Sequence, residues 1–95
     1  MRTKKVALPQ AGIPVVEPNA GRVLFACDDA VFMVMIEQPE GTEADFSRSF
    51  VRVRNGQEAP ADHPYHEYSY KSENAFGGVW HVFSDKVPLF GNETE

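Results

Sequence analysis

The chain has 95 residues, and its 14 acidic and 9 basic side chains give a formal net charge of −5. This length fits one domain, so we expect residues 1–95 to fold as a single unit. The longest apolar run, residues 30–36, is far shorter than the roughly 20 residues that span a bilayer. The single cysteine excludes an internal disulfide framework. Because no apolar signal-peptide segment follows the basic first residues, we expect a cytoplasmic protein.

Prolines and glycines interrupt residues 1–21 at short intervals. Because proline fixes φ and lacks a backbone donor, neither a helix nor a central strand can run through residues 9–18. We expect an extended arm that crosses the domain or reaches a neighbour. Within it, residues 4–8 can add an edge strand and residues 13–16 should be extended.

Residues 22–36 predict a tight β-hairpin. Two runs rich in β-branched and aromatic residues are separated by Asp28 and Asp29, which tolerate turn conformations. A two-residue turn would set Phe25 opposite Phe32 on an apolar core side. The opposite side of the hairpin is also too apolar to be freely solvated, and we expect something to cover it. It carries Leu24, Val31, Met33 and Met35.

Residues 43–54 are compatible with a strand or a helix. A helix would begin at Thr42 as N-cap and would end before Gly56. We favour the strand, because serine and valine are middling to poor helix formers. The strand would place five alternating aromatic and basic side chains on one face: Phe46, Arg48, Phe50, Arg52 and Arg54.

A second hairpin is predicted over residues 66–84. A four-residue connection would place His81 and Phe83 on the face of the tyrosines of the first strand, whereas a five-residue connection would place Trp80 and Val82 there. Both registers stay open at this stage. The whole pattern predicts a mainly β fold, an antiparallel sheet or small barrel of five to six strands over residues 22–90, followed by an acidic tail at 91–95. The alternative is an α+β fold with one helix near residues 43–54.

Two chemical hypotheses depend on particular side chains. His63, His66 and His81 could serve a small β-barrel metal enzyme, since imidazoles are good ligands for zinc or iron. No third ligand is fixed by their spacing, and half-buried sheet histidines explain them equally well. The aromatic and basic face of residues 46–54 could instead bind a single-stranded nucleic acid, by stacking on bases and pairing with phosphates. The net negative charge opposes binding of a polyanion.

We favour a non-enzymatic protein-interaction module with no cofactor. Such a protein would act as a small inhibitor or as an accessory or assembly subunit, of which a phage-encoded protein would be an example. Its partner would be another protein or copies of itself, bound through an aromatic, methionine and arginine surface with an acidic edge. The expected binding residues are Arg48, Arg52, Arg54, Tyr65, Tyr68, Tyr70, Met33, Met35, Asp28 and Asp29.

Overall fold

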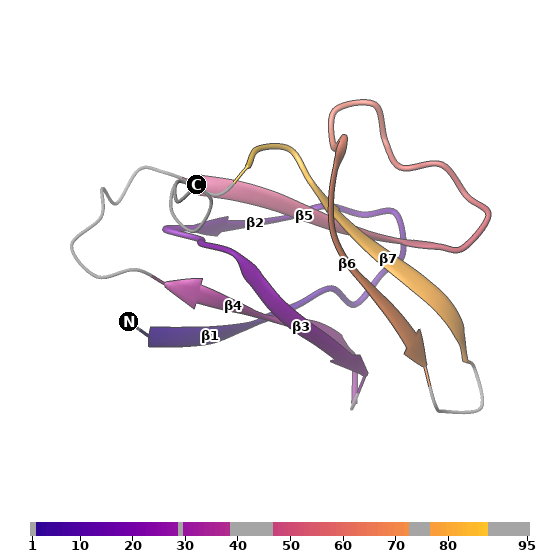
Figure 1. The fold of residues 1–95 in the computed structure, drawn as a ribbon, viewed down its shortest axis with the longest axis horizontal. Coiled ribbons are helices and arrows are strands. Elements are labelled where there is room, and N and C mark those ends of the chain that lie inside the picture. Colours follow the sequence, from indigo (N-terminus) through magenta and orange to yellow (C-terminus); the bar gives the residue numbers. More distant parts are fainter. Residues whose placement is uncertain (1, 29, 39–46, 73–76, 88–95) are drawn as a thin grey trace, which may run out of the picture.

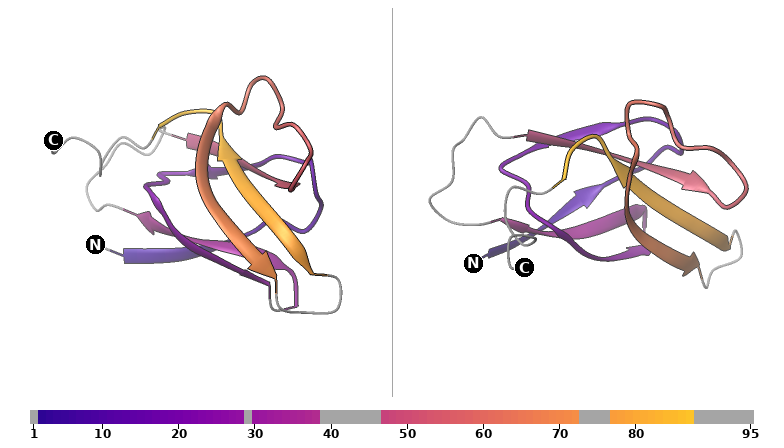
Figure 2. Two further views of the ribbon diagram at one scale, coloured as in Figure 1. Left: turned by 45° about the vertical axis from the view of Figure 1, so that its right-hand side comes forward. Right: turned by 45° about the horizontal axis from the view of Figure 1, so that its top comes forward.

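The computed structural model describes residues 2–28, 30–38, 47–72 and 77–87, which form seven strands and no helix. The strands are β1 (Arg2–Ala7), β2 (Val15–Pro18), β3 (Val23–Asp28), β4 (Phe32–Gln38), β5 (Ser47–Arg54), β6 (Tyr65–Ser72) and β7 (Gly78–Ser84). They make two antiparallel sheets, one in the order β1-β4-β3 and one in the order β2-β5-β7-β6 (Figure 1). At one side of this sandwich, β6 lies beside β3 (Figure 2).

The mainly β prediction is confirmed. Five of the seven described strands lie within residues 22–90, as expected, and the two antiparallel sheets do not close into a barrel. Residues 47–54 are a strand, β5, as the favoured interpretation required. The helical alternative is therefore wrong over that range, and residues 43–46 lie outside the described part.

The additional strands come from the proline-rich arm, which folds back onto the domain. β1 is an edge strand beside β4, and β2 is an edge strand beside β5, so the arm contributes one strand to each sheet. An edge position explains why β2 can end in Pro18, since a proline there interrupts no central ladder. Lys4 of β1 and Glu17 of β2 form an ion pair of 2.6 Å that links the two sheets.

The first hairpin has a different register from the one predicted. Asp28 rather than Phe25 lies opposite Phe32, and Phe25 lies opposite Met35. Because Asp28 pairs with Phe32, three residues rather than two separate the paired positions, and this change puts Phe25 on the side of Met35, where it is 42% exposed. An irregularity between Val23 and Phe25 then shifts the register within β3 and returns Val23 to the core.

The second hairpin adopts the register of the five-residue connection. Tyr70 lies opposite Trp80 and Tyr68 opposite Val82, so these four side chains share a face. A register shift also occurs in β6, between His66 and Tyr68.

The hydrophobic core lies between the two sheets. The Phe32 ring meets Tyr70 edge to face at 5.8 Å and Trp80 at 6.0 Å, which joins the first sheet to the second. The buried cluster consists of Val6, Leu8, Ala20, Val23, Ala26, Phe32, Val34, Ile36, Phe50, Trp80 and Val82.

Candidate functional site

The predicted arginine row is on one face of β5, but that face points toward the space between the sheets. The Arg48 side chain is fully buried and forms an ion pair with Glu67 of β6. Its guanidinium also donates to Ser84 Oγ at 3.1 Å and to the backbone oxygens of Gly21 and, at 3.0 Å, Lys86. Burial lowers the pKa of Arg48, and the nearby Glu67 carboxylate opposes this effect.

The other two arginines of this row stack on the one tryptophan. The guanidinium carbons of Arg52 and Arg54 lie 4.3 and 4.7 Å from the Trp80 ring, within the range of a cation–π contact. Arg52 also donates to the carbonyl oxygens of Leu8 and Pro9, at 2.7 and 3.0 Å. Burial lowers the pKa of Arg52, and the charge of Arg54 lowers it further.

The exposed aromatic and basic strip predicted for nucleic-acid binding is therefore absent from the described residues. Arg48 and Phe50 are buried, and Arg52 is bonded within the domain. Phe46 lies outside the described part. The physical reason is that alternation identifies which residues share a face but not which face is inside.

Tyr68, Tyr70 and Asp28 lie at the junction between the sheets. Tyr68 and Tyr70 are half-buried against the core, whereas Tyr65 is 45% exposed. Ser72 Oγ and the Tyr70 hydroxyl donate to the Asp28 carboxylate, at 2.5 and 3.4 Å. Desolvation and the Asp28 charge raise the pKa of Tyr70. Asp28 is thus a structural acceptor between sheets rather than a solvated turn residue.

The predicted acidic edge is only partly described. Glu37 is buried and pairs with Arg22 at 2.8 Å, so its charge is compensated. Asp29, Glu40, Glu43 and Asp45 lie outside the described residues.

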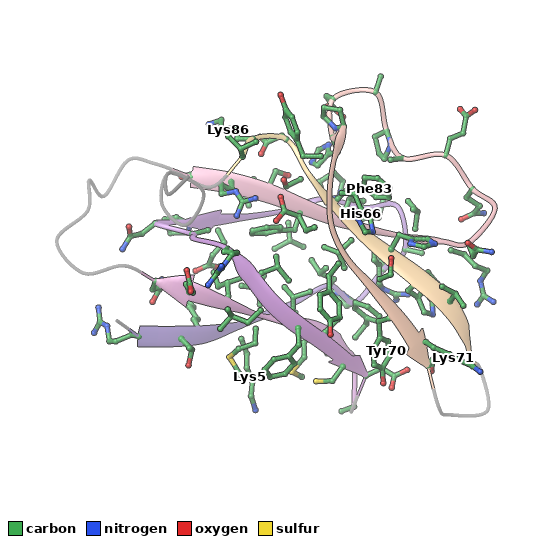
Figure 3. All side chains as sticks on the ribbon, in the orientation of Figure 1. Lys5, His66, Tyr70, Lys71, Phe83 and Lys86 are labelled. Atoms are coloured by element: carbon green, nitrogen blue, oxygen red, sulfur yellow. The ribbon has the colours of Figure 1, made fainter. Side chains whose placement is uncertain are left out.

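The outer face of the sheet β1-β4-β3 carries one exposed aromatic side chain, Phe25, among half-buried apolar ones. Across the sheet, Lys5, Met35 and Phe25 form one row, and Ala7, Met33 and Cys27 form the next. We call these six residues the Met face. Figure 3 shows sulfur-bearing side chains beside Lys5, on the side turned away from the second sheet. Met33, Met35 and Cys27 are half-buried.

Met33 and Met35 lie on this face as predicted, and the sequence interpretation missed Phe25 and Cys27. The two-residue turn expected from the sequence puts both on the core side, whereas the pairing of Asp28 with Phe32 puts them on the side of the methionines. The run from Leu24 to Phe25 is apolar at consecutive positions, which is compatible with a bulge but does not indicate one. No described strand packs over the Met face, so the expected cover is not supplied by the described part of this chain.

The three histidines do not form one metal site. His63 is buried and clasps its loop to β5, with Nε2 2.8 Å from Ser49 Oγ and Nδ1 2.8 Å from Asp62 Oδ1. This hydrogen bond from His63 lowers the pKa of Asp62. The hydrogen-bonded series Ser49, His63 and Asp62 resembles a Ser-His-Asp triad. Ser49 is buried, however, so these hydrogen bonds hold the loop to β5. His66 and His81 lie elsewhere, and no group of three or more His, Cys, Asp or Glu among the described residues could hold a metal.

Comparisons with known proteins give no family for this chain. No family model matches it, and no curated protein or solved structure is significantly similar to it. The described part of the chain has no helix that is long and apolar enough to cross a membrane.

Proposed function

We propose that this protein is a protein-interaction module that binds a short segment of a partner protein through the Met face. The observation that carries the proposal is Phe25, which is 42% exposed beside two half-buried methionines on a sheet face without a described cover. Aromatic residues and methionine are enriched at the centres of protein interfaces. Methionine also adapts its shape to different partners.

The size of the Met face supports a short segment rather than a large docking surface. Three strands about 4.8 Å apart and two residue rows about 7 Å apart give roughly 200 Å². A stable interface between two folded proteins buries about 800 Å² on each partner. The face is therefore too small to hold a symmetric dimer by itself, and it fits a few apolar side chains of a peptide-like segment.

The charge at the border of the face favours a partner segment that also carries carboxylates. Lys5 extends from β1 within the row of Met35 and Phe25. Arg2, at the start of the same edge strand, is also exposed, whereas Lys4 lies on the other side of β1 and pairs with Glu17. Acidic side chains next to the apolar ones would complement this basic border and would speed association.

The test is affinity capture with the tagged full chain from the cells that naturally express it, followed by affinity measurement with the purified partner. Phe25→Asp and Met35→Asp place charges on the Met face. Val16→Asp is the matched control, because Val16 is 64% exposed on β2 of the other sheet.

We expect the partner to bind the wild type and Val16→Asp alike. Each variant of the Met face should lose roughly 30-fold in affinity, the effect of removing a central interface residue. Thermal unfolding checks that all variants remain folded. A partner that binds Phe25→Asp and Met35→Asp as tightly as the wild type would refute the choice of surface, and the absence of any specific partner would refute the function.

A further inference from the structure

A series of hydrogen-bonded polar side chains crosses the outer face of the second sheet, on the opposite side from the arginines of β5. His66 Nε2 and His81 Nδ1 each lie 2.9 Å from the same atom, Ser69 Oγ. His81 Nε2 lies 2.9 Å from Asn55 Oδ1, just after the end of β5. The two imidazole rings are 5.7 Å apart, and His66 also meets Phe83 edge to face at 5.3 Å (Figure 3).

The irregularity in β6 builds this arrangement. In a regular strand, His66 and Ser69 would face opposite sides of the sheet, since they are three positions apart. The register shift between His66 and Tyr68 brings both to the outer face. Ser69 then lies directly opposite His81 on β7, and His66 lies opposite Phe83.

Which atom donates in each of these hydrogen bonds follows from Asn55 Oδ1, which can only accept. Asn55 Oδ1 is an acceptor, so His81 Nε2 carries the hydrogen and His81 Nδ1 keeps its lone pair. Ser69 therefore donates to His81 Nδ1 and accepts from His66 Nε2. The His81 lone pair is thus already aimed at the point that His66 Nε2 also faces.

We propose that His66 Nε2 and His81 Nδ1 bind one divalent transition-metal ion where the Ser69 hydroxyl now bridges them. Neutral imidazole is a preferred ligand of copper, nickel and zinc, with metal–nitrogen distances of about 2.0–2.1 Å. His66 presents the required lone pair when its hydrogen is on Nδ1. His66 is exposed and His81 half-buried, so small ring rotations can close the gap while the Ser69 hydroxyl turns aside.

The surroundings of the two rings have the features of an organised ligand pair. Histidines that bind metals almost always donate their other nitrogen to an acceptor that fixes the ring, which is the role of Asn55 toward His81. The Phe83 edge restricts His66 in the same way. With two protein ligands, the remaining coordination positions are open to water. Among divalent ions, such a nitrogen site should bind Cu²⁺ most tightly.

The test is calorimetric titration of the purified full chain with Cu²⁺, Ni²⁺ and Zn²⁺, together with electron paramagnetic resonance of the Cu²⁺ form. We expect one equivalent of Cu²⁺ with imidazole nitrogen coupling in the spectrum. His66→Ala and His81→Ala should each weaken binding at least tenfold, and the double variant should abolish it. Asn55→Ala should weaken binding by roughly tenfold, as for other residues that orient metal ligands.

Ser69→Ala is the matched control, because it removes the bridging hydroxyl and keeps both imidazoles. We expect it to bind Cu²⁺ as tightly as the wild type or more tightly. All four positions are exposed or half-buried, and thermal unfolding in the absence of metal checks that each variant folds. Absence of stoichiometric Cu²⁺ binding, or equal binding by the wild type and the double histidine variant, would overturn the proposal. This outcome is independent of partner binding at the Met face, which lies on the other sheet.

Discussion

Replacing Glu67 by glutamine should strongly destabilise the domain, because it leaves a buried positive charge without its counter-charge. The Arg48 side chain is fully buried and that of Glu67 is 8% exposed. Glutamine keeps the size and one acceptor oxygen of Glu67, so the change isolates the charge. Ser84 Oγ, which donates to Glu67 at 2.5 Å, would keep an acceptor as well.

The expected loss is about 3–5 kcal/mol of unfolding free energy, the usual cost of breaking a buried ion pair from one side. Domains of this size are stable by only about 5–15 kcal/mol in total. A loss of 3 kcal/mol alone would lower the Tm by roughly 12–24 °C. Exposed Glu58, changed to glutamine as a control, should shift stability by less than about 0.5 kcal/mol.

Urea unfolding followed by tryptophan fluorescence measures this effect directly, since the single tryptophan, Trp80, is buried. The double variant Arg48→Met with Glu67→Leu should recover only part of the loss, because it removes the unpaired charge but also leaves the buried carbonyl oxygen of Gly21 without the Arg48 donor. If Glu67→Gln falls within 1 kcal/mol of the wild type, the charge argument is refuted.

Three further changes test other parts of the fold. Gly78→Ala should cost about 1–3 kcal/mol of unfolding free energy, and more than Gly56→Ala. Gly78 has φ 117° and a new Cβ would lie 3.2 Å from a guanidinium nitrogen of Arg54, whereas Gly56 has φ 94° and open space around it. Urea midpoints compare the two variants, and equal losses of stability would contradict the close approach at Gly78. Arg52→Met should cost about 1–3 kcal/mol, since it leaves two carbonyl oxygens without their donor and removes a cation–π contact; an unchanged midpoint would refute this role. Asp62 accepts a hydrogen bond from His63 that lowers the Asp62 pKa, so its contribution is present above about pH 4 and is lost as the pH falls through the lowered value. Asp62→Asn should therefore make the urea midpoint fall less steeply below about pH 4. If the pH dependence of the midpoint is the same as in the wild type, the His63–Asp62 hydrogen bond does not contribute as argued.

The strands could be predicted from sequence because their signals are local. Alternating apolar residues and β-branched runs indicate β3, β4 and β5 without reference to the rest of the chain. The same signals place Arg48, Phe50 and Arg52 on one face. They do not say that this face is inside, because the residue that makes burial of Arg48 tolerable, Glu67, is on another strand.

The register of the first hairpin and the irregularity in β6 explain most of what the sequence could not predict. Phe25 is on the Met face instead of in the core because three residues rather than two separate the paired Asp28 and Phe32. An irregularity within a strand reverses the faces of the residues beyond it, and no residue type in β6 marks it unambiguously. His66 and Ser69 share a face for that reason, and Glu67 reaches the interior to meet Arg48. Met33 and Met35 were predicted correctly because β4 is regular.

The arm that supplies one edge strand to each sheet has a consequence for how the chain folds. Ala7 pairs with Met33, and Val15 pairs with Phe50, so neither β1 nor β2 has a partner among its neighbours in sequence. Such distant pairings require large loops to close before they contribute contacts, which makes folding slow. The arm is synthesised before β4 and β5, so β1 and β2 cannot pair until those strands have formed. Until it docks, the edges of β4 and β5 remain open to pairing with other chains. Aggregation during refolding should therefore increase when the arm is shortened, even where the core residues are unchanged.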